Sequence, residues 1–136
     1  MSSHIIIATM KRIEDLKYVF ERHILNISSG EEYSIDLPLT LPYVYEIFGY
    51  EKLSFISFLE EFMELGDIVE VYEYCDGKEL LPESINNPNE ARTINLLQLT
   101  YKDELGEYQF DKRNWMNELT TRRVVSKRSV TTFMKY

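Results

Sequence analysis

Residues 51–75 read EKLSFISFLEEFMELGDIVEVYEYC, so a helix signal is followed almost directly by a strand signal. In the first half, four apolar side chains recur at spacings of three and four, which is the period of an amphipathic helix. These are Phe55, Phe58, Leu59 and Phe62. The second half, 68–75, is rich in β-branched and aromatic residues and favours a strand. With Gly66 as the stop between them, we expect a helix over 51–65 and a strand over 68–75.

On the N-terminal side, three consecutive isoleucines predict a short buried strand over 4–9. Helical spacing of apolar residues predicts a helix over about 10–25. Thr40 is a suitable N-cap and Gly49 a suitable stop for a second, short helix over 41–48.

On the C-terminal side, 93–101 is expected to form one central strand, and 103–106 a hairpin turn that ends in glycine. Asp111 would cap one or two helical turns through Leu119. The tail, 121–134, is rich in valine and threonine and favours extended structure. Helices are thus expected early and strands late. This order predicts one α+β domain over 1–136, with a mainly antiparallel sheet of about four to six strands and two to three helices packed on one face.

Charge is distributed unevenly along the chain. The 136 residues include 15 Lys+Arg and 23 Asp+Glu, for a formal net charge of -8. An acidic body over 1–110 holds 8 basic and 21 acidic residues, whereas the basic segment over 111–136 holds 7 basic and 2 acidic residues. Two interpretations stay open: the basic segment pairs with acidic neighbours of the same sheet, or the two ends meet different partners.

The sequence carries no constellation typical of an enzyme. Its two histidines, His4 and His23, and its one cysteine, Cys75, show no spacing typical of a nucleophile with its base or of a metal site. A glycine-rich phosphate loop is also missing, so we expect no catalysis, no cofactor and no metal. An enzyme would need a pocket that gathers His23 or Cys75 with carboxylates. The lone cysteine, with no membrane-length apolar run and no leader, predicts a cytoplasmic protein without membrane contact.

Our first hypothesis is a small acidic module that binds and neutralises a basic partner protein, such as a nuclease or another nucleic-acid-binding protein. In type and composition it is similar to immunity proteins, antitoxins and phage-encoded inhibitors. Tyrosine is enriched at protein interfaces, and an acidic field accelerates encounter with a basic partner. The candidate contact residues are acidic or aromatic: Glu61, Glu64, Glu70, Tyr72, Glu73 and Tyr74.

The alternative is a nucleic-acid-associated regulatory or accessory protein that uses the basic segment. Cations interleaved with an aromatic ring suit phosphate contact and base stacking. The candidate residues are Arg113, Trp115, Arg122, Arg123, Lys127 and Arg128. An exposed strand edge in this segment would also permit a homodimer.

Overall fold

The long strand β4 (Ile68–Cys75) lies in the middle of the sheet, between β1 (Ser3–Thr9) and β8 (Thr131–Met134). β1 runs antiparallel to β4 from Ser3 opposite Cys75 to Thr9 opposite Val69. The strands predicted over 68–75 and 4–9 are therefore confirmed. The structure is a computed structural model that describes residues 3–13, 24–26, 39–47, 50–75, 91–125 and 129–136.

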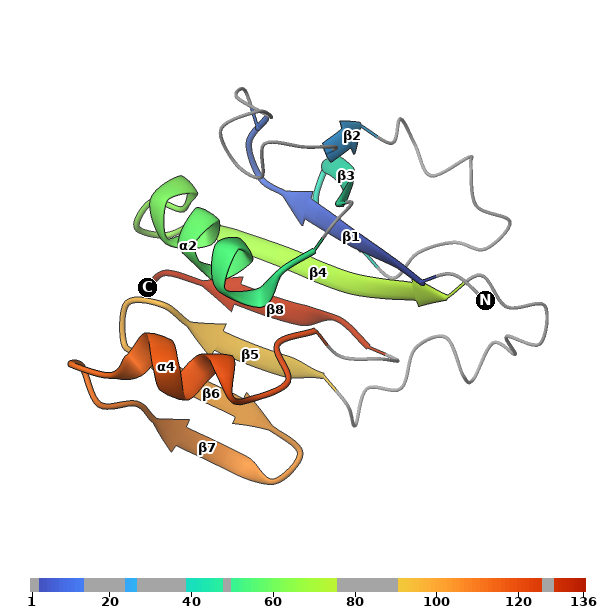
Figure 1. The fold of residues 1–136 in the computed structure, drawn as a ribbon. Coiled ribbons are helices and arrows are strands. Elements are labelled where there is room, and N and C mark those ends of the chain that lie inside the picture. Colours follow the sequence, from blue (N-terminus) through green and yellow to red (C-terminus); the bar gives the residue numbers. More distant parts are fainter. Residues whose placement is uncertain (1–2, 14–23, 27–38, 48–49, 76–90, 126–128) are drawn as a thin grey trace.

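The strands of the described residues join one eight-stranded sheet in the order β2-β3-β1-β4-β8-β5-β6-β7 (Figure 1). All neighbours are antiparallel except β5 and β8, which run parallel. The α+β class and the mainly antiparallel sheet are confirmed, with more strands than the expected number. The other strands are β2 (Ile24–Asn26), β3 (Tyr43–Ile47), β5 (Arg92–Asn95), β6 (Thr100–Asp103) and β7 (Gly106–Gln109).

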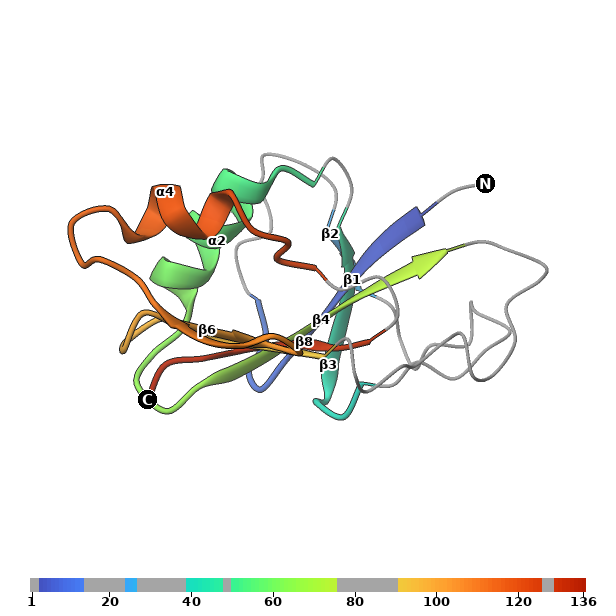
Figure 2. The same cartoon turned by 90° about the horizontal axis from the view of Figure 1, so that it is seen from below.

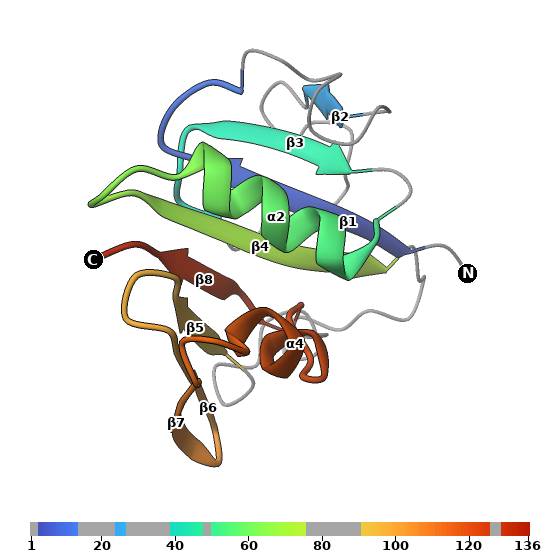
Figure 3. The same cartoon turned by 60° about the vertical axis from the view of Figure 1, so that its left-hand side comes forward.

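Two helices of the described chain, α2 (Lys52–Phe62) and α4 (Trp115–Thr120), lie on the same face of the sheet (Figure 2). α2 lies over β1 and β4 (Figure 3), and α4 lies over β5 and β6. The helix predicted over 51–65 is confirmed in its main part. It begins after Glu51, whose carboxylate accepts hydrogen bonds from the backbone N–H of Leu53 at 2.7 Å and of Ser54 at 3.3 Å. Glu51 is therefore the N-cap of α2.

The hydrophobic core lies between the sheet and these helices. From α2 it receives Phe55, whose ring packs edge-on against Phe133 of β8 with 5.9 Å between centroids. Val69 and Val71 of β4 and Leu119 of α4 complete its centre, each at most 1% exposed. Burying side chains of this size is the main favourable contribution to folding.

The short helix predicted over 41–48 is wrong, because Tyr43–Ile47 form β3. This strand pairs with β1 on one side and with β2 on the other. Tyr45 and Ile47 are 2% and 3% exposed, so alternate residues of β3 fill the core as a strand requires. Within the described residues three strands precede α2, so the expected order of helices before strands does not hold there.

The helix predicted over 10–25 is wrong at both of its ends. Met10 and Lys11 bend away after β1, and Ile24–Asn26 form the strand β2. The middle of that prediction, 14–23, lies outside the described residues.

The single strand predicted over 93–101 is divided into β5 and β6 by a turn over 96–99. The side-chain oxygen of Asn95 accepts hydrogen bonds from the N–H groups of Leu97 and Gln98, both at 3.0 Å. Leu99 adopts φ 58°, a left-handed conformation that ends the turn.

The hairpin turn at 103–106, a short helix that includes Leu119 and extended structure in the tail at β8 are confirmed. Asp111 as the cap of that helix is wrong, because the N-cap of α4 is Asn114; the Asp111 side chain accepts a hydrogen bond from the N–H of Arg113 at 3.1 Å in the turn before it.

Candidate functional site

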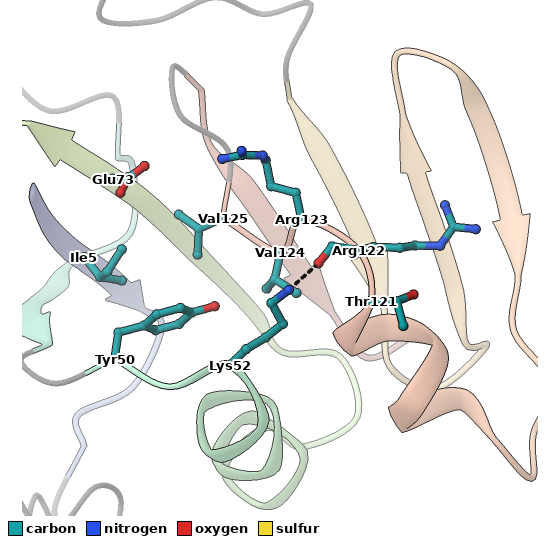
Figure 4. Close-up of a pocket in the computed structure, with 9 residues that line it drawn as sticks. All are labelled: Ile5, Tyr50, Lys52, Glu73, Thr121, Arg122, Arg123, Val124 and Val125. Atoms are coloured by element: carbon teal, nitrogen blue, oxygen red, sulfur yellow. Dashed lines mark hydrogen bonds between the residues drawn. The ribbon is translucent and has the colours of Figure 1, made fainter.

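A pocket of about 370 Å³ opens between the start of α2, the β1 and β4 strands, and the chain that follows α4 (Figure 4). Its apolar wall consists of Ile5, Val124 and Val125. Its polar groups come from elements that are far apart in the sequence, so the pocket exists only in the folded chain.

Lys52, the first residue of α2, ties one wall of the pocket together. Its ammonium donates hydrogen bonds to the backbone oxygens of Thr120 at 3.0 Å and Arg122 at 2.7 Å. These carbonyls lie at the end of α4 and just beyond it, where helix carbonyls lack partners within the helix. Lys52 therefore holds the chain after α4 against the start of α2.

Glu73 and Arg123 bring opposite charges to the same pocket (Figure 4). Tyr50 lines it as well, with its hydroxyl turned toward the side chains drawn there. Burial, together with the negative charges of Glu51 and Glu73, raises the pKa of Tyr50 to about 12. Tyr50 is therefore a neutral hydroxyl at ordinary pH, able both to donate and to accept a hydrogen bond.

Arg122 also borders the pocket, but its guanidinium is engaged elsewhere. It lies 4.1 Å from the ring centroid of Tyr108, 5.2 Å from that of Tyr101 and 5.9 Å from that of Phe110. A guanidinium over aromatic faces is stabilised by cation–π attraction. Arg122 thus fastens the chain after α4 onto β6 and β7.

The predicted acidic and aromatic contact residues of β4 fall on opposite faces of the sheet. Glu73 points to the helix-covered face, as do Val69 and Val71. Glu70 and Tyr72 alternate with them and belong to the other face. Tyr72 is only 3% exposed. The side chain of Tyr74 lies outside the described residues.

Glu70 serves as an internal acceptor. Its carboxylate receives hydrogen bonds from the backbone N–H and hydroxyl of Thr40, at 2.7 and 2.8 Å, and from the N–H of Leu41 at 3.0 Å. Thr40, expected to cap a helix, instead anchors the chain before β3 to β4.

Glu61 and Glu64 belong to the end of α2 and the turn that follows it. Glu64 is 80% exposed at its side chain and forms an ion pair with Lys11 at 2.6 Å. Lys11 also lies 3.2 Å from Asp67. Burial acts to raise the pKa of Asp67, but hydrogen bonds from the Glu64 N–H and from Lys11 outweigh it, so that this pKa lies below its usual value.

The same end of the sheet gathers four exposed apolar side chains, which we call the apolar end: Met10, Leu65, Leu97 and Tyr136. Backbone hydrogen bonds place their segments side by side. The N–H of Gly66 donates to Lys135 O at 2.7 Å, and that of Leu96 donates to Met134 O at 2.8 Å.

Four of the six predicted nucleic-acid residues are described by the structure, and these four are not gathered on one surface. Arg123 lines the pocket, Arg122 stacks on aromatic rings, and Trp115 is a half-buried side chain packed against the core. Arg113 is exposed before α4, and Lys127 and Arg128 lie outside the described residues.

Sequence reasoning named Glu73 and Arg123 in two different sets and missed Tyr50 and Lys52. No signal in the sequence pairs Lys52 with Arg122, which is 70 positions away. Within the described ranges there is no group of three or more His, Cys, Asp or Glu residues able to hold a metal. His23, named for a catalytic role, lies outside those ranges, as does the side chain of Cys75.

Fold and site together define an α+β protein whose mainly antiparallel sheet carries helices on one face. A pocket lined by groups of both charges opens between the start of α2 and the chain after α4. No family model, curated protein or solved structure matches this chain. In the part of the chain that is described, no helix has the length and apolar character needed to cross a membrane.

Proposed function

We propose that this protein is a protein-binding module whose apolar end docks on a basic partner protein and blocks it. The observation that carries the proposal is the exposure of large apolar side chains on neighbouring segments: Leu65 is 74% exposed, Leu97 51% and Tyr136 51%. Exposed apolar groups gathered in one place and rimmed by polar residues are typical of protein–protein contact sites.

The rim of this surface favours a basic partner. Around it lie the carboxylates of Glu60, Glu61, Glu64 and Asp67. Two cations lie beside them: Lys11 pairs with Glu64 and Asp67, and Lys135 lies 3.8 Å from Glu60. Four carboxylates therefore face two ammonium groups, and the rim keeps a net negative charge. The acidic rim, within a chain of net charge -8, would steer a basic protein toward the apolar end and speed its association.

Fewer residues of β4 are suited to partner contact than the sequence indicated. Glu70 is occupied by Thr40 and Leu41, and Tyr72 is buried, so neither supports the proposal. Glu61 and Glu64 keep the role that we expected of them. The nucleic-acid alternative stays a prediction without a structural feature in its favour.

The proposal is tested by capture of partners from the native host with the full chain and with two variants. Leu65→Asp combined with Leu97→Asp places charge in the centre of the apolar end. Leu105→Asp is the matched control, because Leu105 is 90% exposed at the tip of the β6–β7 hairpin. We expect a basic protein, identified by mass spectrometry, to bind the native chain and Leu105→Asp but not the double variant.

Binding of that purified partner is then measured as a function of salt. We expect association to slow as salt rises, because the exposed charges that steer encounter become screened. Equal capture by the double variant, or a captured partner that is acidic, would contradict the proposal.

A further inference from the structure

We propose that the pocket between the start of α2 and the chain after α4 binds a small zwitterion of the α-amino acid class with an apolar side chain. The pocket offers a carboxylate, a guanidinium and a neutral hydroxyl around an apolar wall, in a volume of about 370 Å³. Pockets for small ligands are typically a few hundred Å³ and combine apolar walls with a few polar groups, as here. The inference does not depend on the proposed function, because it concerns different residues.

The two charged groups are available to a ligand. In the part of the chain that is described, neither Glu73 nor Arg123 forms a side-chain hydrogen bond or an ion pair. Two further cations line the pocket, and neither is paired with Glu73. The ammonium of Lys52 is held by the carbonyls of Thr120 and Arg122, and the guanidinium of Arg122 lies over aromatic rings of β6 and β7. Glu73 thus retains acceptors for an ammonium, and Arg123 retains donors for a carboxylate.

A zwitterion satisfies both charges at once, and this argues against a purely cationic or purely anionic ligand. An amine alone would leave Arg123 unpaired, and a carboxylate alone would leave Glu73 unpaired. A charge that a ligand covers without pairing it loses hydration with no compensating contact. An ammonium and a carboxylate bonded to one carbon, as in an α-amino acid, match a pocket in which both partner charges are turned to the same end (Figure 4).

The apolar wall of the pocket determines which side chain the ligand carries. Ile5, Val124 and Val125 present an aliphatic surface next to the ring of Tyr50. An aliphatic side chain placed there leaves water and contributes affinity in proportion to the area it buries. The class is therefore an apolar α-amino acid, for which L-leucine is a suitable probe.

The backbone that carries Arg123 is held in place before any ligand arrives. The hydroxyl of Tyr101 donates a hydrogen bond to Arg123 O at 2.9 Å, and Lys52 holds the preceding carbonyl at 2.7 Å. Such preorganisation lowers the entropy lost on binding.

The test is titration of the full chain with L-leucine, followed by NMR chemical shifts and by calorimetry. L-Leucinamide, N-acetyl-L-leucine and glycine serve as comparison ligands that lack the carboxylate, the ammonium and the side chain in turn. We expect L-leucine to shift signals of Val124 and Val125 and each comparison ligand to bind roughly tenfold more weakly or worse. Because this comparison uses the native chain, it does not depend on the folding of any variant.

Glu73→Gln and Arg123→Gln remove the two charges in turn, with Glu107→Gln and Arg113→Gln as matched controls on exposed residues outside the pocket. We expect the first pair to weaken L-leucine binding roughly tenfold and the second pair to leave it unchanged. Absence of any shift with L-leucine, equal binding of the comparison ligands, or equal affinity in all four variants would overturn the proposal.

Discussion

The ammonium of Lys52 lies 2.7 Å from the backbone oxygen of Arg122, so the first residue of α2 is bonded to the chain just beyond α4. The same ammonium also donates a hydrogen bond to the backbone oxygen of Thr120 at 3.0 Å. One side chain therefore fixes the position of both helices relative to each other and forms a wall of the pocket.

Lys52→Met should lower the free energy of unfolding by about 2 kcal/mol, because two hydrogen bonds from a charged donor are lost while the aliphatic part is kept. Denaturant titration measures this loss, with Lys112→Met, at an exposed turn position, as the control. A stability equal to that of the control would show that the Lys52 bridge contributes nothing.

A second lysine acts at the other end of α2. Lys135 follows β8, and its ammonium donates to the carbonyls of Glu60 at 2.9 Å and Met63 at 3.0 Å. It also lies 3.8 Å from the Glu60 carboxylate. A cation at a helix C-terminus satisfies free carbonyls and interacts favourably with the helix dipole.

We expect Lys135→Met to destabilise the protein by about 1–2 kcal/mol and to increase hydrogen exchange in the last turn of α2. The Met63 N–H, bonded to Leu59 O at 2.9 Å, is the group to follow. Exchange at the native rate in this variant would mean that the last turn is held by packing alone.

These lysine contacts also explain part of the uneven charge. Two cations of the basic segment have partners within the chain: Lys135 pairs with Glu60 of the acidic body, and Arg122 lies over aromatic rings. Pairing within the chain, one of the two interpretations of the charge, therefore accounts for some of these cations. Lys112 and Arg113 remain exposed.

Local sequence patterns predicted an element correctly where its apolar pattern matches the side chains that it buries or the strands with which it pairs. In α2 the apolar spacing coincides with the buried side chains Phe55, Phe58 and Leu59, and in β4 the composition and the pairing agree. At 41–48 cap and stop signals were present, but pairing of β3 with β1 and β2 overrode them. The turn after β5 depends on one side chain, that of Asn95, which no periodicity reveals.

The candidate site was harder to predict than the fold, because its groups meet only through tertiary contacts. The charge of each residue suggests a different partner: Glu73 was predicted to contact a basic protein, and Arg123 to contact nucleic acid. Alternation along a strand places Glu73 and Glu70 on opposite faces of the sheet, although they are only three positions apart.

Glu70→Ala should destabilise the protein by about 1–3 kcal/mol, because three donors of Thr40 and Leu41 lose their acceptor. Glu107→Ala, at an exposed position of β7, is the control and should change stability by less than about 0.5 kcal/mol. Equal unfolding midpoints for the two variants would contradict the structural role of Glu70. The expected loss also means that reversing the charge of Glu70 is a poor test of partner binding.

The raised pKa of Tyr50 makes stability depend on pH in the alkaline range. Burial, with the negative charges of Glu51 and Glu73, raises this pKa to about 12 in the folded chain, whereas an unfolded tyrosine titrates near its ordinary pKa of 10.0. Below the unfolded value both states keep the proton, and the stabilising preference for the neutral hydroxyl is fully present. As pH rises from the unfolded toward the folded value, only the unfolded chain ionises, so this contribution is lost.

Tyr50→Phe removes this titration while it keeps the ring, whose centroid lies 5.5 Å from that of Phe55. Between about pH 10 and pH 12 we expect the free energy of unfolding to fall less steeply in Tyr50→Phe than in the native chain. Lysines titrate in the same range in both proteins, so the measured quantity is the difference between the two slopes. Glu73→Gln should lower the Tyr50 pKa, because one of the negative charges that opposes ionisation is removed. Parallel slopes in the native chain and Tyr50→Phe would show that Tyr50 ionises as freely in the folded pocket as in the unfolded chain.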